Sequence, residues 1–257
     1  MIEIENLCFA YDSAEVLHNI SLTVADGAFD VVVGPNGGGK TTLLRLILGL
    51  IKPVYGRIEV MGMPPTRARR HMAYVPQALA FDSKFPVSVL DVVLMGRVDR
   101  HVFGPYGRAD REAANAALCK VGLAGYGGRP FRSLSGGERQ RVIVAQAIAS
   151  QPRLMLLDEP GANLDPESRL QLYQFLATLT PEITILLVSH NLNVVTPVAE
   201  HIICVNRTAH SHRIEEISKD ALENGSWAHL THEHCPVADQ DMAREHSPHY
   251  GKPGARS

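Results

Sequence analysis

The sequence predicts an α/β protein with a mainly parallel sheet, an antiparallel β subdomain and an inserted helical subdomain. Apolar and polar residues alternate near the N-terminus, which is typical of strands with one exposed face. Short, wholly apolar runs follow, with helical segments between them, as expected for a parallel sheet buried on both faces. The middle third of the chain instead has the pattern of helices.

The N-terminal third begins with the alternating segments, which predict antiparallel strands. A buried β-branched run comes next and ends at Gly34. The segment Lys40–Leu50 then has apolar residues at helical spacing, so a helix is expected there. The predicted strands of this part are Ile2–Leu7, Ile20–Val24, Val31–Val33, Ile58–Val60 and Met72–Val75.

The middle of the chain, residues about 85–150, is expected to be mostly helical, and Asp110–Val121 is rich in alanine. Strands return after it, with a helix expected near Pro166–Leu179. These later strands are Leu154–Leu157, Ile183–Val188 and Ile202–Val205. Strand–helix alternation of this kind places the helical subdomain, about 82–150, as an insertion in the parallel sheet.

Composition excludes several classes of function. The 25 Lys and Arg nearly balance the 27 Asp and Glu, so no basic field favours nucleic acid. Four scattered cysteines predict no disulfide framework and suit a reducing cytoplasm. The N-terminus has no signal-peptide pattern, and the apolar runs fall short of the roughly 20 residues that span a bilayer. Any membrane function is therefore expected to come through a separate partner.

A glycine-rich run lies between the buried strand and the helix at Lys40. It fits the P-loop pattern G-x-x-x-x-G-K-[ST] and reads Gly34, Pro35, Asn36, Gly37, Gly38, Gly39, Lys40 and Thr41. Lys40 is expected to neutralise the β- and γ-phosphates of a nucleotide, and the Thr41 hydroxyl to ligate Mg²⁺. The amides from Gly37 to Thr42 would add positive charge at the helix N-terminus. An accidental glycine-rich turn is disfavoured, because the flanking strand and helix are those of a P-loop.

Two further motifs handle phosphate or its magnesium. Asp158 and Glu159 follow a buried strand, so Asp158 is expected to hold Mg²⁺ and Glu159 to accept a proton from the attacking water. The alternative is a helix N-cap. The run Leu134–Arg141 contains a glycine-rich turn opening a helix, a natural anion site. A Ser135–Glu138 capping box is the alternative there, and both interpretations can hold.

These three motifs, in this order, resemble those of the ATP-binding cassette (ABC) ATPases over most of residues 1–205. The resemblance implies a P-loop NTPase core that hydrolyses ATP with Mg²⁺. It implies that His190 contacts the γ-phosphate and helps to position the water. It assigns Gln77 to a loop that senses Mg²⁺, and Tyr11 to stacking on adenine.

The resemblance also implies a dimer. In ABC ATPases the turn Ser135, Gly136 and Gly137 covers the ATP of a partner subunit, so two copies would sandwich two nucleotides with C2 symmetry. Asp165 stands where the family expects the loop that communicates between the two sites. Ala162 departs from the pattern, since many members have serine there, and this leaves the cross-subunit contacts in doubt.

The segment Phe85–Arg97 lies where importer-type subunits grip a membrane permease. It and the triple-glycine P-loop resemble ATPase subunits of zinc, manganese or iron uptake systems. The resemblance therefore implies a subunit on the cytoplasmic face of the membrane that energises import of a divalent metal delivered by an extracytoplasmic binding protein. Alternatives are an iron-chelate or cobalamin-type importer, an ABC exporter, and a non-transport ABC protein, which usually has two cassettes or a long coiled coil.

The C-terminal stretch differs in composition, since seven of the twelve histidines lie between His210 and the end. The expected division is a cassette domain at 1–215 and a His-rich tail at 216–257. Four tail residues are donors that suit Zn²⁺, namely His229, His232, His234 and Cys235. The hypothesis is that this cluster senses or buffers metal, and the alternative is a solvated polypeptide.

Overall fold

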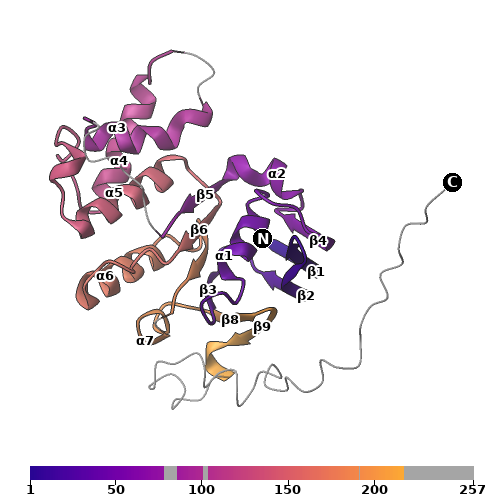
Figure 1. The fold of residues 1–257 in the computed structure, drawn as a ribbon. Helices are drawn as coiled ribbons and strands as arrows, with labels where there is room; N and C mark the ends of the chain where they lie inside the picture. The colour runs from indigo at the N-terminus through magenta and orange to yellow at the C-terminus, as the bar shows by residue number, and fades with distance from the viewer. Residues whose placement is uncertain (78–85, 101–103, 191, 217–257) are drawn as a thin grey trace, which may run out of the picture.

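The computed structural model describes residues 1–77, 86–100, 104–190 and 192–216, and it contains two sheets and the helices around them (Figure 1). The larger sheet is built, in order, from β5 (Met72–Val75), β6 (Leu154–Asp158), β7 (Thr184–Val188), β3 (Phe29–Val33), β8 (His201–Asn206) and β9 (Thr208–Arg213). Its strands pair in parallel except for β9, which is antiparallel to β8. The smaller sheet is antiparallel, with the order β2 (Ala14–Val24), β1 (Ile2–Tyr11) and β4 (Tyr55–Val60). The prediction of a mainly parallel sheet with an antiparallel β subdomain is confirmed.

Different helices cover the two faces of the larger sheet: α1 (Lys40–Ile47) on one face, and α3 to α6 (within residues 89–177) on the other (Figure 1). Helix α1 lies between the two sheets, since its leucines share one core with residues of both. The remaining helical segments are α2 (Pro65–Ala68), η1 (Arg69–His71), α3 (Val89–Leu94), η2 (Met95–Arg100), α4 (Arg108–Lys120), η3 (Phe131–Ser133), α5 (Gly136–Ala149), α6 (Pro166–Ala177), α7 (Leu192–Val195) and η4 (Ile214–Glu216). Residues of α3, α4, α5 and α6 form the core on the opposite face.

The strands of the larger sheet are buried on both faces, which explains their continuous apolar runs. In β6, Leu154 and Leu156 belong to the core around α1, whereas Met155 and Leu157 belong to the core under the other helices. Successive side chains of a strand point to opposite faces, so one apolar run serves both cores. The four residues are fully buried.

An ion pair fastens the helices between β5 and β6 to one another. Arg97 of η2 and Asp110 of α4 are each only 6% exposed, and Arg97 Nε donates to Asp110 Oδ1 at 3.1 Å. Arg97 Nη1 also donates to the carbonyl of Ala149 at the end of α5, at 3.0 Å. Arg97 was expected in a membrane-docking segment, but its guanidinium lies inside the helical layer. Removing one partner of a buried pair costs about 3–5 kcal/mol.

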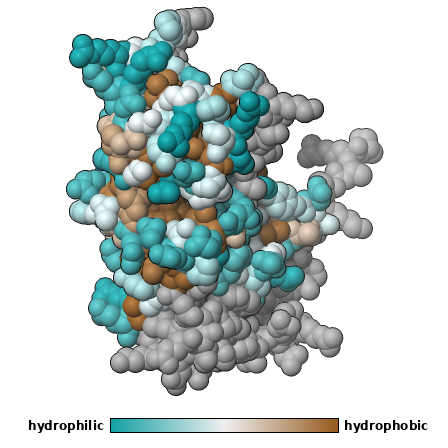
Figure 2. Space-filling model, turned by 90° about the vertical axis from the view of Figure 1, so that its left-hand side faces the viewer, coloured by the Kyte–Doolittle hydropathy of each residue, from teal (hydrophilic) through white to brown (hydrophobic). Residues whose placement is uncertain are grey.

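Apolar side chains are exposed beside this pair. Met95 is 41% and Val98 58% exposed, so both are open to a partner. Figure 2 shows the side of the molecule on which α3–α6 lie, with apolar side chains gathered in the middle of a hydrophilic surround. No helix of the described residues is both long enough and apolar enough to cross a membrane.

Several elements differ from the predictions. Strands β1 and β2 run further than predicted, because bulges interrupt the regular alternation that marks a strand in the sequence. Helix α1 ends at Ile47 rather than at Leu50, since Gly49 takes a positive φ of 65°. Strand β9 was not predicted, because an edge strand of mostly polar residues lacks an apolar run. It contains His210 and His212, so these two histidines belong to the sheet.

Candidate functional site

The carboxyl ends of four parallel strands meet at one edge of the larger sheet, and each delivers a predicted site residue. The glycine-rich loop follows β3, Asp158 and Glu159 close β6, His190 follows β7, and Gln77 follows β5. Ligands of open α/β sheets bind at such an edge. A pocket of about 440 Å³ lies there, lined by Val16, Asn36, Gly37, Gly39, Lys40, Thr41, Thr42, Gln77, Glu159 and His190.

The loop from Gly34 to Gly39 packs tightly on the end of β8. A Cβ on Gly34, whose φ is 149°, would lie 2.0 Å from the carbonyl oxygen of Val205, and one on Gly38 would lie 2.8 Å from it. Only glycine allows this close approach of two backbones. Gly37 instead borders the pocket and has open space beside it. The loop is therefore fixed on one side and open to a ligand on the other.

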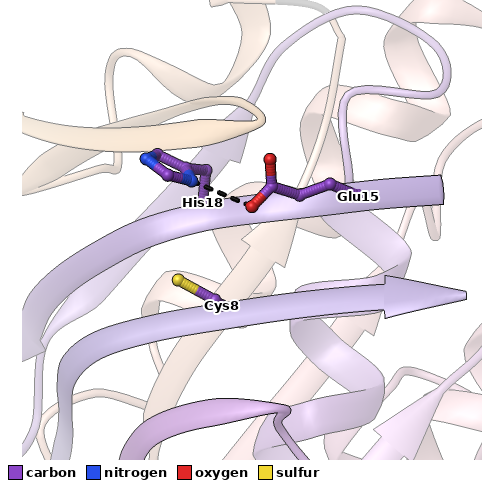
Figure 3. A group of neighbouring side chains, drawn as sticks. All are labelled: Cys8, Glu15 and His18. Atoms are coloured by element: carbon purple, nitrogen blue, oxygen red, sulfur yellow. Dashed lines mark hydrogen bonds and ion pairs between the residues drawn. The ribbon is translucent and has the colours of Figure 1, made fainter. Parts of the chain in front are cut away.

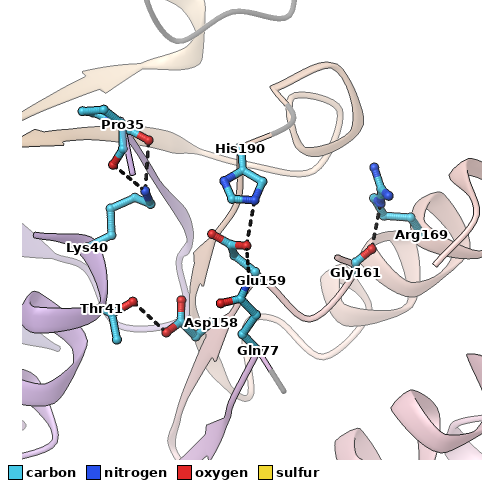
Figure 4. A network of polar contacts seen from close by, with 10 residues as sticks. Pro35, Lys40, Thr41, Gln77, Asp158, Glu159, Gly161, Arg169 and His190 are labelled. Carbon is cyan, nitrogen blue, oxygen red and sulfur yellow. Dashed lines mark hydrogen bonds and ion pairs between the residues drawn. The ribbon is translucent and has the colours of Figure 1, made fainter. Parts of the chain in front are cut away.

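Lys40 is 6% exposed and is held by the loop that precedes it (Figure 4). Its Nζ donates to the carbonyl of Gly34 at 3.0 Å and to that of Pro35 at 2.9 Å. Burial lowers the pKa of Lys40, and the nearby carboxylates of Glu159 and Asp158 oppose that shift. An ammonium group held by neutral carbonyls at a pocket wall is a strong site for phosphate oxygens.

The oxygen ligands predicted for Mg²⁺ are already paired. Thr41 Oγ1 donates to Asp158 Oδ2 at 3.0 Å, and the Asp158 residue is only 4% exposed. A hydroxyl and a carboxylate are the hard donors that Mg²⁺ prefers, so these residues fit the ion. The Tyr74 hydroxyl lies 3.4 Å from the same Oδ2. Burial, with the Asp158 charge as a second cause, raises the pKa of Tyr74 to about 12, so its phenol is a neutral donor near pH 7.

Sequence reasoning missed Tyr74. The sequence held one hint of its role: Tyr74 lies in a predicted strand, three residues before Gln77. In the structure this strand, β5, pairs with β6, and Tyr74 lies opposite Leu156 near the end of β6 that carries Asp158.

Glu159 is the centre of a second polar cluster (Figure 4). Its Oε2 accepts a hydrogen bond from Gln77 Nε2 at 2.7 Å and lies 2.7 Å from His190 Nε2. The residue is 8% exposed and has a φ of 49°, a left-handed conformation that is uncommon outside glycine. Such conformations concentrate at functional sites. Gln77 contacts Glu159 rather than the Thr41–Asp158 pair, so its magnesium role stays a prediction.

The second glycine-rich turn lies away from the pocket that its own chain forms. Ser135 is the N-cap of α5: its Oγ accepts from the Glu138 amide at 3.3 Å, and Glu138 Oε2 accepts from the Ser135 amide at 2.8 Å. The bond from the Ser135 amide to the carboxylate lowers the pKa of Glu138. Ser135 and Gly136 are exposed, and neither these two nor Gly137 lines the pocket. Both predictions for this turn, capping and an accessible anion site, are compatible with this geometry.

The loop from Gly161 to Asp165 is braced by an arginine that sequence reasoning missed. Asp165 is the N-cap of α6 and accepts from the Ser168 amide at 2.9 Å. Hydrogen bonds from the Ser168 side chain and then its amide lower the pKa of Asp165. Arg169 Nε donates to the Gly161 carbonyl at 3.0 Å, and Arg169 Nη2 to the Leu164 carbonyl at 2.9 Å. The only signal for this contact was that Arg169 lies one helical turn after Asp165.

Tyr11 lies at the end of β1 and is 41% exposed. Its ring meets Phe9 edge-on with centroids 4.8 Å apart, and its hydroxyl accepts from Arg45 Nη1 at 3.4 Å. Val16, not Tyr11, lines the pocket, so adenine stacking by Tyr11 stays a prediction. The predicted zinc ligands His229, His232, His234 and Cys235 lie outside the described residues, as does Phe85.

Comparison with known proteins decides the family. The family model described as "ABC transporter" matches residues 17–162. The chain belongs to the ABC transporter family. A dimeric ATP-binding cassette bound to ADP and Pi, in a post-hydrolysis state, has a TM-score of 0.73 and 26% identity, and the match covers 83% of this chain and 99% of that one. The protein described here is therefore an ABC transporter cassette that binds ATP and is an ATPase.

Two curated relatives are named for metal transport. The zinc uptake system ATP-binding protein ZurA of Listeria monocytogenes is 38% identical over 80% of this chain and 83% of its own. The manganese transport system ATP-binding protein MntA of Synechocystis is 36% identical over 86% of this chain and 88% of its own. The similarity to this ABC transporter chain spans more than four fifths of both relatives.

Proposed function

We propose that this chain is the ATP-hydrolysing subunit that energises a membrane importer for a divalent metal ion, zinc or manganese. The observation that carries the proposal is the nearly full-length similarity to proteins named for zinc uptake and manganese transport. The polar clusters around Asp158 and Glu159 supply the hydrolytic part of it. We propose a cassette domain at 1–215, with the helical subdomain inserted at about 82–150.

The proposed hydrolysis rests on positioning and charge neutralisation. Lys40 and the amides of the glycine-rich loop bind the phosphates, and Thr41, Asp158 and Gln77 are the proposed magnesium site. Mg²⁺ supplies charge neutralisation on the phosphate oxygens when bound. Glu159 accepts the proton of the attacking water, because its carboxylate lies at the pocket wall. The hydrogen bond from Gln77 and the contact with His190 hold that carboxylate in place.

We propose that the nucleotide site is completed by a second copy of this chain. The exposed turn at Ser135 and Gly136 lies outside its own pocket, which suits a role on the partner's γ-phosphate. Its amides open α5, a helix long enough to present positive charge at its N-terminus. Asp165 and the braced loop beside it then lie at the interface. Such a pair has isologous C2 symmetry.

The proposed membrane partner is an integral permease on which this subunit sits at the cytoplasmic face, with an extracytoplasmic metal-binding protein acting through the permease. Met95 and Val98 support this docking, since both are exposed apolar side chains beside the rigid Arg97–Asp110 pair. Nucleic acid is not a proposed partner. An iron-chelate or cobalamin-type importer and an ABC exporter are the competing proposals.

Metal content of cells tests the proposal. A strain lacking this chain is expected to accumulate less zinc or manganese, measured by elemental analysis, in low-metal medium. Wild type and the exposed-loop control Glu182→Gln should restore the metal content, whereas Glu159→Gln should not. Unchanged zinc and manganese, with loss of iron-chelate or cobalamin uptake instead, would reject the metal proposal and leave the ATPase intact.

A second proposal concerns residues 216–257. We propose that His229, His232, His234 and Cys235 bind Zn²⁺ and lower ATPase activity when cytoplasmic metal is plentiful. Replacing the three histidines by alanine and the cysteine by serine in the full chain should remove the inhibition of the assembled transporter by zinc. The Cys119→Ser control should keep it. An unchanged zinc response in the fourfold variant would exclude a sensing role.

A further inference from the structure

Three metal-ligating side chains meet on the antiparallel sheet. They are Cys8 of β1 with Glu15 and His18 of β2, and their ligand atoms all lie within 4.8 Å of one another (Figure 3). His18 Nδ1 is 2.9 Å from Glu15 Oε1. Glu15 and His18 are exposed and Cys8 is half-buried, so an ion can reach all three from solvent. Cys8 is one of the four cysteines whose scattered positions predicted no disulfide framework.

Bulges in β2 bring the three side chains to one face. Between the pairs Phe9↔Leu17 and Leu7↔Ile20, β1 advances two residues and β2 three. The extra residue lets His18 and its neighbour Asn19, whose φ is 45°, both face solvent. A second register shift precedes it, between Phe9 and Ala10. In a regular strand, residues three apart point to opposite faces, so Glu15 and His18 could not meet without such a shift.

The surroundings of the sulfur suit a metal-bound thiolate. The backbone amide of Asn19 donates to Cys8 Sγ at 3.2 Å. An N–H donor complements the negative charge of a thiolate, which is the form that binds metal. That donor comes from the bulge between Leu17 and Ile20, so the irregular part of β2 both gathers the ligands and supplies a partner for the sulfur.

We propose that Cys8, Glu15 and His18 bind one Zn²⁺, with water in the fourth position. The donor set of thiolate, imidazole and carboxylate is one that zinc accepts in tetrahedral sites with three protein ligands. The bond lengths of such sites place ligand atoms about 3.3–3.7 Å apart. The present separations, 2.9 Å for one pair and up to 4.8 Å for the others, lie on either side of that range. Rotation of exposed side chains closes the difference. Two negative ligands neutralise the ion, and the thiolate disfavours the harder Mn²⁺.

The proposed zinc site lies beside the nucleotide pocket. The His18 amide donates to the Arg207 carbonyl at 2.7 Å, and the Arg207 amide donates to the carbonyl of Gly38 in the glycine-rich loop at 3.1 Å. Val16, between the two β2 ligands, lines the pocket itself. The purified chain is thus expected to bind zinc at this site even when the predicted ligands of the tail are removed.

Cobalt titration of the full chain tests the site, because Co²⁺ substitutes for zinc and gives a sulfur-to-metal charge-transfer band when a thiolate binds it. The background carries His229→Ala, His232→Ala, His234→Ala and Cys235→Ser, so that the tail cannot contribute. One equivalent of Co²⁺ is expected to produce the band. Added Zn²⁺ is expected to displace the Co²⁺ and remove the band. Cys8→Ser should abolish the band and Cys119→Ser, an exposed thiol on α4, should keep it.

The His18→Ala variant should weaken cobalt affinity by at least about tenfold, the loss that removing even an outer-shell partner causes. Circular dichroism of each variant establishes that the sheet is intact. Absence of a band in the background chain, or a band that survives Cys8→Ser, would overturn the proposal. Since the measurement needs no permease and no transport, its failure is distinct from a failure of the proposed importer function.

Discussion

Replacing Glu159 by glutamine should lower the rate of ATP hydrolysis by about 10²–10⁴-fold, the usual contribution of a general base. The amide is nearly isosteric and can still accept a hydrogen bond from Gln77, so the pocket keeps its shape. It cannot accept a proton from water. ATP binding should therefore stay near wild type, and the closed dimer should accumulate. Phosphate release and nucleotide affinity of the purified chain measure the two effects separately.

The matched control for this variant is Glu182→Gln, the same change on an exposed residue before β7. It should leave turnover and affinity unchanged. Full turnover in Glu159→Gln would remove Glu159 as the base. Loss of ATP affinity together with turnover would instead mean that the carboxylate holds the pocket together, and would equally reject the catalytic role.

Replacing Ser135 by aspartate should abolish ATP-dependent dimerisation while leaving the monomer stable. Aspartate and serine are nearly equal N-caps, and Asp165 already caps α6 in this chain, so the free energy of unfolding should change by less than about 0.5 kcal/mol. The new carboxylate would face the γ-phosphate of the partner's ATP, and such a like-charge contact costs several kcal/mol. Dimerisation with a non-hydrolysable ATP analogue should weaken by more than about 100-fold.

Light scattering with and without the nucleotide analogue measures this effect. Ser88→Asp is the matched control, because Ser88 caps α3 in a capping box with Asp91, as Ser135 does with Glu138. This control should dimerise normally. If the Ser135→Asp chain also dimerises normally, the turn is only a helix cap, and the proposal that it contacts the partner's ATP is rejected.

The local predictions that succeeded depended on patterns within a few residues. The strand at Met72–Val75 is observed with the predicted bounds, and the helix predicted near Pro166–Leu179 is observed as Pro166–Ala177. Each has a clear end signal: α6 begins with the Asp165 cap and Pro166, and Pro76 follows β5. Strand β9 has no such local pattern and was not predicted, since its pairing with β8 rather than its own composition makes it a strand. The buried pair Arg97–Asp110 could not be predicted from local patterns either, because its two partners lie on different helical segments.

The chemistry of the site was predictable in kind but not in its contacts. Lys40, Asp158 and Glu159 were recognisable because each sits in a short motif at the end of a buried strand. That Gln77 and His190 both meet one carboxylate oxygen of Glu159 depends on the order in which β5, β6, β7 and β3 pair. Strand order is set by packing of the whole sheet and leaves no trace in local spacing.

The amino-acid sequence alone was enough to establish the nucleotide-binding motifs, the mainly parallel sheet and the membership of an ABC family, because phosphate loops and buried strands impose fixed residue types at fixed spacing. Tertiary structure decided which side chains share a pocket, why the turn at Ser135 lies outside it, and that Cys8, Glu15 and His18 meet across a bulge. Those arrangements follow from strand register and helix packing, which arise from contacts between residues far apart in the chain.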